Sequence, residues 1–329
     1  MREPEMQRIT TIRTSVIATV ALAVILVTGS AAGSAVSTKY RLIDLGTLGG
    51  ESSYATAIND RGDVIGSSET ADGSYHGFLW RNGRMTDLGA VRPTDINNRG
   101  QIVGTLDTAS GLEAVLWFRG KVTDLGTLGG ASDWPRAIND RGQVVGMATM
   151  TSGHSTPFLW SKDRMRKLNL DEVSGINNRG QVAGGQLVDP NGFHASLWSR
   201  GTVTDLGAGP FNRSNTYGIN DRGWVIGWKF SEQQYERGVL WRNGTATDVG
   251  TLGGNRTHLI SINGRGQILG ISTLPNGYER PVLWQRGVLT DLSVRGIDPY
   301  ADLADINNQG VIAATVRPVW GTSRAVIYR

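Results

Sequence analysis

Few side chains in this 329-residue chain could act as nucleophiles, metal ligands or acid–base groups, and they are widely spaced. The absence of cysteine excludes disulfides, thiolate metal sites and a thiol nucleophile. No His-x-x-x-His motif and no His-Glu pair occurs, so we expect no zinc site. A Ser-His-Asp arrangement stays open, although no nucleophile elbow is present. The four histidines are His76, His154, His194 and His258.

Aspartate and asparagine are abundant, but most of them recur at fixed intervals. A Thr-Asp-Leu or Thr-Asp-Val motif occurs too often to be one catalytic site, and its carboxylate is suited to accept hydrogen bonds from turn amides. Asn59–Gly62 resembles part of a calcium loop but lacks the further oxygen ligands and the terminal glutamate. Gly-rich Asp44–Gly50 has no following Lys-Ser or Lys-Thr, so it is no phosphate-binding loop. We therefore expect neither a metal nor a cofactor. The motif aspartates are Asp87, Asp124, Asp205, Asp248 and Asp291.

These residues belong to a repeat of about 41 residues that fills the chain beyond its first forty residues. An Ile-Asn pair occurs seven times, a glycine follows each asparagine three residues later, and a Leu-Trp pair comes next in six copies. Ile327-Tyr328 takes its place in the seventh copy. The isoleucines are Ile58, Ile96, Ile138, Ile176, Ile219, Ile262 and Ile306, and the tryptophans are Trp80, Trp117, Trp160, Trp198, Trp241 and Trp284.

Each repeat is typical of four short β-strands. The Asn-Asp-Arg-Gly segment predicts a tight turn between the first two strands, because asparagine can bond nearby backbone and glycine adopts a positive φ. Arg81–Arg84, with Asn-Gly at its centre, predicts a two-residue hairpin between the last two strands. The regular spacing of the tryptophans indicates a core between repeats. No window has the 3.6-residue apolar period of a helix, so we expect none after the leader.

Four strands per repeat at this period predict an all-β fold, a β-propeller. The first strand after the leader, Tyr40–Leu45, matches the fourth strand of a repeat, and the last, Ala325–Arg329, matches the third. We therefore predict seven blades of four antiparallel strands, closed by the N-terminal strand pairing in the C-terminal blade, which leaves no exposed edge. An open β-solenoid is the alternative, although its spacing would be shorter and more even.

The connections between the expected strands differ in length on the two faces of such a propeller. The first–second and third–fourth turns are short, whereas the other connections are long and varied, as in Thr105–Glu113 and Gly126–Trp134. Because function commonly lies on varied loops held by a rigid frame, we expect the long-loop face to bind a ligand. Its aromatic rings suit sugars or protein partners, unless they fold over the blades as local core. These aromatic residues are Trp134, Trp228, Tyr235, Tyr278 and Trp320.

The residue before the isoleucine of each Ile-Asn pair is small in five repeats, as the crowded region near the axis requires. Asp95 and Asp305 occupy this position in the other two repeats. We expect the two aspartates either to form an ion or ligand site in the central channel or to be solvated there.

Residues 1–35 are typical of a secretory signal peptide. Three arginines precede an apolar run, Val16–Val27, and small residues follow as far as Ala35. The run is shorter than the roughly 20 residues that span a bilayer, so we favour cleavage over an uncleaved membrane anchor. Residues 36–329 would then form the propeller. The net charge of +4 is close to neutral for this length and argues against nucleic-acid binding.

The repeat resembles the HAF-repeat family of extracellular bacterial proteins. The likeness rests on copies such as His76–Trp80 and Ala137–Gly146 and extends over residues 40–329. The name-giving triplet is altered here, since Gly77 stands where the family has alanine. The resemblance implies export and a repeat scaffold, and it supplies no catalytic residues.

Together these observations favour a secreted bacterial scaffold, a non-catalytic monomer that binds an extracellular polysaccharide or protein on its long-loop face. One alternative is a lyase or hydrolase at the mouth of the channel, which a cluster of His, Glu or Asp with shifted pKa values would favour. Another is a purely structural surface module. Contact with a membrane is expected only through an uncleaved leader.

Overall fold

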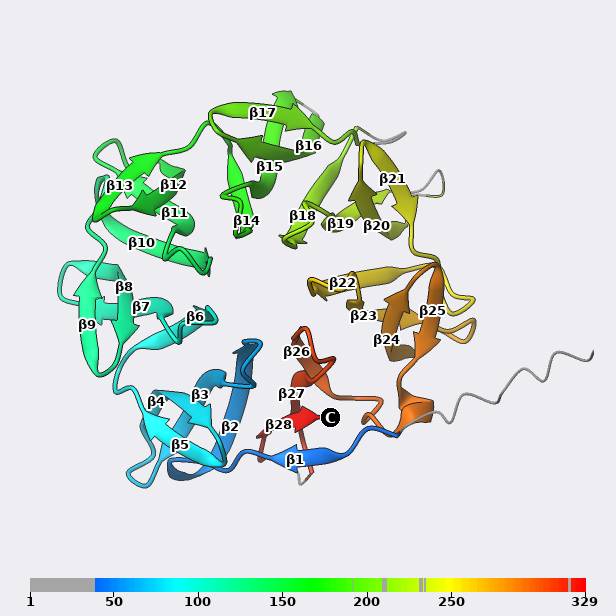
Figure 1. The fold of residues 1–329 in the computed structure, drawn as a ribbon, viewed down its shortest axis with the longest axis horizontal. Coiled ribbons are helices and arrows are strands. Elements are labelled where there is room, and N and C mark those ends of the chain that lie inside the picture. The colour runs from blue at the N-terminus through cyan, green and yellow to red at the C-terminus, as the bar shows by residue number, and fades with distance from the viewer. Residues whose placement is uncertain (1–38, 191, 209–211, 231–232, 234, 319–320) are drawn as a thin grey trace, which may run out of the picture. The chain divides into compact units, whose positions relative to one another are not determined.

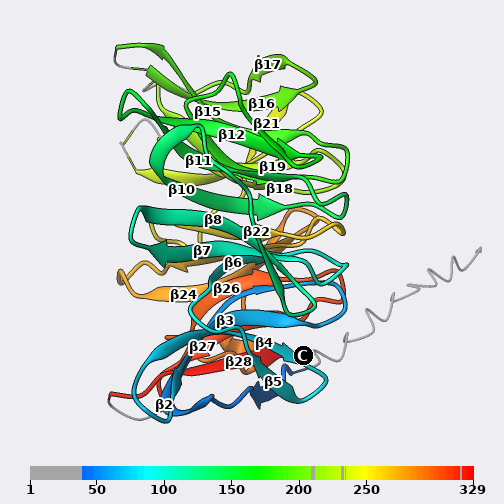
Figure 2. The same cartoon turned by 90° about the vertical axis from the view of Figure 1, so that its left-hand side faces the viewer.

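The computed structural model describes residues 39–190, 192–208, 212–230, 233, 235–318 and 321–329. The expected signal peptide, residues 1–35, lies outside them. From residue 39 on, the chain forms seven four-stranded antiparallel sheets around a central axis (Figure 1). Figure 2 shows the same ring from the side. The prediction of a seven-bladed β-propeller is confirmed.

The blades follow one another along the chain, and the first strand of each lies nearest the axis (Figure 1). Blade 1 is β2 (Gly49–Ile58), β3 (Val64–Thr70), β4 (Tyr75–Arg81) and β5 (Arg84–Asp87). Blade 2 is β6 (Arg92–Ile96), β7 (Ile102–Thr108), β8 (Gly111–Phe118) and β9 (Lys121–Asp124). Blade 3 is β10 (Gly129–Ile138), β11 (Val144–Met150), β12 (Ser155–Ser161) and β13 (Arg164–Lys167). Blade 4 is β14 (Glu172–Ile176), β15 (Val182–Asp189), β16 (Gly192–Ser199) and β17 (Thr202–Asp205). Blade 5 is β18 (Ser214–Ile219), β19 (Val225–Phe230), β20 (Glu236–Arg242) and β21 (Thr245–Asp248). Blade 6 is β22 (Thr257–Ile262), β23 (Ile268–Thr273), β24 (Glu279–Gln285) and β25 (Val288–Asp291).

Blade 7 joins the two ends of the chain. Its strands are β26 (Asp302–Ile306), β27 (Ile312–Val316), β28 (Arg324–Tyr328) and β1 (Leu42–Asp44). The strand β1 pairs antiparallel with β28, with Ile43 opposite Ile327. Ile43, Leu45 and Ile327 pack with Ile58 and Phe78 of blade 1, so the closing strand also helps to bury the core between the last and first blades.

The turns have the backbone geometry that their residue types predict. Asn82 and Gly83 both have a positive φ, 51° and 82°, as a two-residue hairpin of this kind requires. In the first turn of blade 1, Gly62 has a φ of 80° and donates to the carbonyl oxygen of Asn59 at 3.0 Å.

The tryptophans of the third strands lie in the core between blades, as expected. Trp160, Trp241 and Trp284 are buried, and the other three are half-buried against neighbouring apolar clusters. Trp160 belongs to a cluster that contains Val103 and Leu125 of blade 2 as well as Phe158 of its own blade. The tryptophans therefore help to hold adjacent sheets together.

The long connections expected on one face are largely continued strands. The segment Thr105–Glu113 leaves only two residues between β7 and β8, because the pairing continues from Thr105 opposite Ala114 to Thr108 opposite Gly111. Trp134 and Trp228, placed on loops by the sequence, accordingly lie in β10 and β19. The hydrogen-bonded ladder between strands can continue through polar residues, so a prediction based on polarity alone overestimated the length of these loops.

Helical structure among the described residues is limited to a single 3₁₀ turn, η1 (Ser293–Arg295), between β25 and β26. A turn of three residues is too short to show an apolar period, which explains its absence from the prediction. No helix in the described part of the chain is long and apolar enough to cross a membrane.

Candidate functional site

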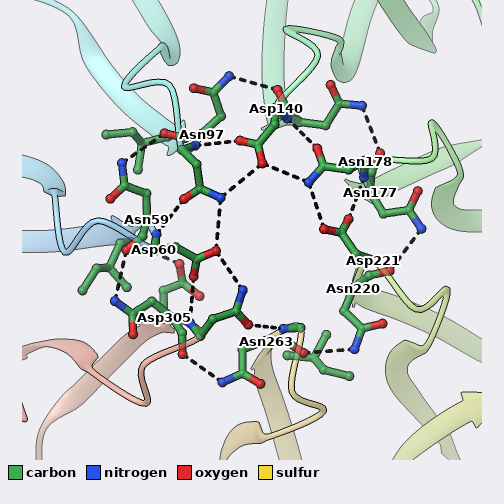
Figure 3. A pocket seen from close by; sticks show the side chains of 18 of the residues that line it. Asn59, Asp60, Asn97, Asp140, Asn177, Asn178, Asn220, Asp221, Asn263 and Asp305 are labelled. Atoms are coloured by element: carbon green, nitrogen blue, oxygen red, sulfur yellow. Dashed lines mark hydrogen bonds between the residues drawn. The ribbon is translucent and has the colours of Figure 1, made fainter.

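One end of the central channel is lined by a ring of seven asparagines, the Asn residues of the Ile-Asn pairs (Figure 3). The side-chain Nδ2 of each donates to the backbone oxygen of the next asparagine around the axis, at 2.8–3.1 Å, and the last bond returns to Asn59. The Oδ1 atom of each asparagine accepts backbone amides of its own turn, as in Asn59 with Arg61 and Asp63. The ring is thus fully used in joining turns and blades.

A second circle lies beside the asparagine ring and surrounds a cavity of about 210 Å³. Its aspartates and asparagines each accept the backbone amide of the corresponding residue in the preceding blade, at 2.6–2.8 Å. The circle is interrupted at Gly264, which has no side chain to accept the amide of Asp221. These residues are Asp60, Asn98, Asp140, Asn178, Asp221, Gly264 and Asn308. Because its side chains bond across blades, this end of the channel is structural. The described residues contain no cluster of three or more His, Asp or Glu placed to hold a metal ion.

Asp95 and Asp305 each lie at a β-bulge of an innermost strand and join neighbouring blades, and Asp305 also lines the channel cavity. Asp95 accepts the amides of Ile96 and of Ile138 in the next blade, both at 2.8 Å. Asp305 accepts the amide of Ile58 in blade 1 at 3.1 Å and the hydroxyl of Ser261 in blade 6. Burial raises the pKa of Asp95 to about 7 and also raises the pKa of Asp305. Both carboxyl groups therefore bridge backbones, and binding of an ion or ligand by them stays a prediction.

Toward the other end of the channel, one position of the innermost strand is occupied by a different type of residue in each of the seven blades. This position lies four residues before the terminal isoleucine, which is the isoleucine of the Ile-Asn pair at the end of each innermost strand. Its partner on the second strand is the residue that follows a glycine in six blades and an alanine in blade 7. In these six blades the glycine lets the two strands approach closely. A Cβ on it would lie only 1.9–2.5 Å from the carbonyl oxygen of the innermost-strand residue. We call these seven residues the variable ring: Tyr54, Arg92, Trp134, Glu172, Asn215, His258 and Asp302.

The contrast between the two ends identifies the candidate site. Side chains that recur in all seven blades of the chain stabilise the feature that the blades have in common, the propeller frame of strands and turns. At the variable ring the backbone is equivalent, yet the side chains include aromatic, acidic, basic and amide groups. Functional groups are carried in this way by variable positions on a rigid scaffold.

Two hollows adjoin the variable ring near blades 4 and 5, and the second also reaches blade 3. The first has a volume of about 430 Å³ and brings Trp228, Phe193 and Leu187 together with polar side chains. The ring of Trp228 is held edge-on to Phe230, with ring centres 5.2 Å apart. We call this hollow the Trp228 groove; it is lined by Glu172, Leu187, Pro190, Gly192, Phe193, Arg213, Asn215 and Trp228.

The second hollow, which we call the inner cavity, has a volume of about 320 Å³ and reaches the innermost strands β10, β14 and β18. It shares Glu172 and Asn215 with the Trp228 groove, and Asn215 Nδ2 donates to Glu172 Oε2 at 2.8 Å. The two hollows therefore meet at one hydrogen-bonded pair. The inner cavity is lined by Arg136, Glu172, Val173, Ser174, Asn215, Thr216 and Tyr217.

Tyr217 connects the inner cavity to an acid–base cluster between blades 5 and 6. Its hydroxyl donates to Glu236 Oε1 at 2.9 Å and lies 3.1 Å from His258 Nδ1, which is itself 3.1 Å from the same carboxylate oxygen. Burial and the charge of Glu236 raise the pKa of Tyr217. Burial opposes ionisation of Glu236, but hydrogen bonds from His258 and Tyr217 outweigh it and lower the pKa of that carboxyl group. The cluster thus combines an ionised acid, a protonated phenol and an imidazole.

The aromatic residues singled out in the sequence do not gather at one place. Trp228 lines the groove, whereas Trp134, Tyr235 and Tyr278, which are 36%, 47% and 61% exposed, are not among the described residues that line it. Trp320 lies outside the described residues. A ligand role for these four stays a prediction.

The Thr-Asp-Leu aspartates accept turn amides as expected, for example Asp87 from Gly89 at 2.7 Å. The sequence did not indicate that several also pair with a basic side chain of the third strand. His76 Nδ1 lies 2.9 Å from Asp87, and His194 Nδ1 lies 2.7 Å from Asp205. These two histidines occupy equivalent positions and belong to the frame.

No protein-family model matches the chain, and no curated protein matches it in sequence. Among solved structures, the β-propeller domain of the Trilobed protease from Pyrococcus furiosus is similar, with a TM-score of 0.61, 9% identity, and coverage of 84% of this chain and 93% of that one. A Mycobacterium tuberculosis puromycin-hydrolyzing peptidase gives a TM-score of 0.54 and 13% identity over 84% of this chain and 49% of its own. At these identities the likeness establishes the β-propeller fold alone.

Proposed function

We propose that this protein is a secreted binding scaffold that holds a polysaccharide chain in the Trp228 groove. The observation that carries the proposal is the meeting of an aromatic face with planar polar groups in one hollow. The apolar C–H face of a sugar ring packs well on a flat aromatic side chain such as Trp228. Glu172, Asn215 and Arg213, on the same lining, offer acceptors and donors for the sugar hydroxyls.

A polysaccharide suits this surface better than a protein partner. The groove and the inner cavity, with volumes of about 430 and 320 Å³, share Glu172 and Asn215, so together they offer room for a chain several sugars long. Protein interfaces usually need a larger, flatter area with a central apolar cluster. Export follows from the basic and apolar pattern of residues 1–35 and from the resemblance to HAF-repeat proteins, and it is part of the proposal.

Binding to a glycan array, followed by calorimetry on the best polysaccharide, tests the proposal. We expect Trp228→Ala to weaken binding by at least tenfold, because aromatic contacts dominate such sites. Tyr278→Ala is the control, since Tyr278 is exposed and is not among the described residues that line the groove. Binding that is unchanged in Trp228→Ala, or that is lost only in Tyr278→Ala, would refute the assignment of the groove. A chain that binds no glycan but captures a protein, or nothing, would favour the other two functions considered from the sequence.

A further inference from the structure

We infer that the propeller docks on a membrane surface rich in anionic phospholipids through its short-turn face. This face is the end of the propeller formed by the first turns, between the first and second strands of each blade, and by the hairpins between the third and fourth strands. The inference is independent of the Trp228 groove, but the choice of a lipid partner draws on the export that is part of the proposed function. It adds a membrane contact that the sequence indicated only for an uncleaved leader.

The first turns and the hairpins lie at one end of the molecule. Because the strands of a blade are antiparallel, both kinds of turn lie at the same end of the sheet. In blade 1, for example, Val64 directly after the first turn is opposite Trp80 directly before the hairpin. The asparagine ring joins the first turns of all seven blades around the axis. Every first turn leaves five residues between its strands and every hairpin leaves two, so turns of one kind project equally in all blades.

Basic residues surround the axis on this face. The first turn of six blades carries an arginine two residues after the ring asparagine, and all six arginines are exposed. Each of the six hairpins carries at least one further Arg or Lys, as Arg119 and Lys121 do in blade 2. We call the six first-turn arginines the arginine circle: Arg61, Arg99, Arg141, Arg179, Arg222 and Arg265.

The charges of the arginine circle are not neutralised by ion pairs within the described part of the chain. Eight of the nine ion pairs there lie toward the opposite ends of the blades, as Arg92 and Asp107 do, and the ninth joins Arg81 to Asp63. No arginine of the circle takes part in any of the nine. The circle therefore presents a positive field to solvent.

Few acidic side chains oppose this field on the short-turn face. Asp163 lies in the hairpin of blade 3, where Lys162 and Arg164 flank it. Three further carboxylates line the channel inside the circle and accept backbone amides of the preceding blade; they belong to Asp60, Asp140 and Asp221. The net charge of +4 gave no sign of this surface, because it averages the basic end of the propeller with an end that carries most of the acidic residues.

Blade 7 contributes a hollow that suits an anionic headgroup. Its first turn has Gln309 in place of the arginine, and Gln309 lines a cavity of about 430 Å³. Lys39, Arg295 and Arg329 also line this cavity, and no acidic side chain does. Such a lining fits a lipid phosphate, because guanidinium and ammonium groups bind phosphate oxygens by charge-assisted hydrogen bonds.

An anionic bilayer suits this face better than a nucleic acid. Single-stranded nucleic acids follow a basic groove and stack their bases on aromatic side chains, whereas these charges are spread around the whole ring on turns of equal length. A bilayer offers an extended plane of phosphates, which attracts clustered Lys and Arg side chains. Docking by the short-turn face also turns the variable ring, toward the other end of the channel, away from the membrane.

Sedimentation with lipid vesicles tests the inference. The protein is residues 36–329, the product of leader cleavage, because this segment contains every strand of the closed propeller. One set of vesicles is phosphatidylcholine alone, and the other is an equal mixture of phosphatidylcholine and phosphatidylglycerol. We expect binding to the mixed vesicles only, and its loss near 1 M salt, where the Debye length falls to about 3 Å.

Two double variants with the same change of charge locate the contact. Arg99→Gln with Arg141→Gln should weaken binding to the mixed vesicles by at least tenfold, since each basic residue near an anionic surface contributes about fivefold. Glutamine suits this position, because Gln309 occupies it in blade 7. The control is Arg166→Gln with Lys167→Gln, at exposed positions of β13 toward the opposite end of blade 3, which should change binding by less than about threefold.

Four outcomes would overturn the inference: no binding to either kind of vesicle, equal binding to both, an unchanged affinity in Arg99→Gln with Arg141→Gln, or an equal loss in the two double variants. Tighter binding to double-stranded DNA than to mixed vesicles at the same salt concentration would also overturn it, in favour of a nucleic-acid partner. None of these results bears on the Trp228 groove, whose glycan binding is measured separately on the array.

Discussion

Asp133 offers a direct test of how the repeat specifies the frame. Five residues before the terminal isoleucine, three blades carry a hydroxyl residue whose oxygen donates to the carbonyl of a glycine seven positions earlier, at 2.7–2.9 Å. These residues are Ser53, Ser214 and Thr257. Blade 3 has Asp133 at this position, only 2% exposed, and its Oδ1 atom has no hydrogen-bond partner in the described structure. The equivalent glycine is Gly126. An ionised carboxylate cannot donate to a carbonyl oxygen, whereas a protonated one can.

The pKa of Asp133 gives the sign and size of the change in folding stability with pH. Burial raises it from its ordinary value of 3.8 to about 6. Between these values the folded protein keeps a proton that the unfolded chain has released, so stability is fully present below pH 4 and is lost as the pH rises toward 6. A difference of about two pKa units corresponds to at most about 3 kcal/mol, and we expect about 1–3 kcal/mol.

The substitution Asp133→Ser restores the hydroxyl of the other blades and removes the buried charge. We expect this variant to be more stable than the original by about 1–3 kcal/mol at pH 7.5, with the advantage disappearing near pH 4. Urea unfolding followed by tryptophan fluorescence at several pH values measures the difference. The control is Asp171→Ser, because Asp171 occupies the same position in blade 4 but is exposed and accepts the amide of Leu187. A difference between Asp133→Ser and the original that does not vary with pH, or a loss of stability at neutral pH, would refute the reasoning.

Three further predictions concern the residues that hold the blades together. Trp160→Ala should lower the free energy of unfolding by about 3–5 kcal/mol, as large deletions in a core do, and an unchanged melting temperature would contradict its core position. Asn177→Ala should cost about 1–3 kcal/mol in the same assay, because it opens the asparagine ring and leaves two partly buried amides, those of Arg179 and Gln181, without their acceptor. A chain that begins at Gly49 lacks β1 and exposes the edge of β28, so light scattering should detect oligomers that the full chain does not form.

The architecture could be predicted because it depends on features that repeat. Each blade carries the same turn and strand signals, and the two incomplete repeats at the ends of the chain complement each other, as β1 and β28 confirm. Because there are seven copies, the repeat is still recognisable where one copy departs from it, as in blade 3, which lacks the Thr-Asp-Leu motif. The asparagine ring was missed, because the sequence indicated a bond to the local turn and gave no sign of the neighbouring blade.

The candidate site was predicted only in part, for a physical reason. Trp228 was singled out as an aromatic residue, but its partners Glu172 and Phe193 come from blade 4 and are brought near by the packing of sheets. Likewise Tyr217 and His258 are 41 residues apart in sequence, about one repeat, and no short-range motif links them. A signal was present: aligning the repeats on their isoleucines shows one position, that of Glu172 and His258, at which all seven residues differ.

The separation of frame and site explains how these differences are tolerated. The positions that close the propeller are buried and hydrogen-bonded across blades, so a change there costs packing or leaves polar groups unsatisfied. The variable ring contributes its backbone to the sheet, while side chains such as those of Glu172 and Trp134 remain exposed. Substitutions at exposed positions usually change stability by about 0.5 kcal/mol or less. Residues in the ring can therefore be exchanged to suit a ligand with little effect on the fold, and the opposite end of the channel, where the same asparagine occurs seven times, has no such freedom.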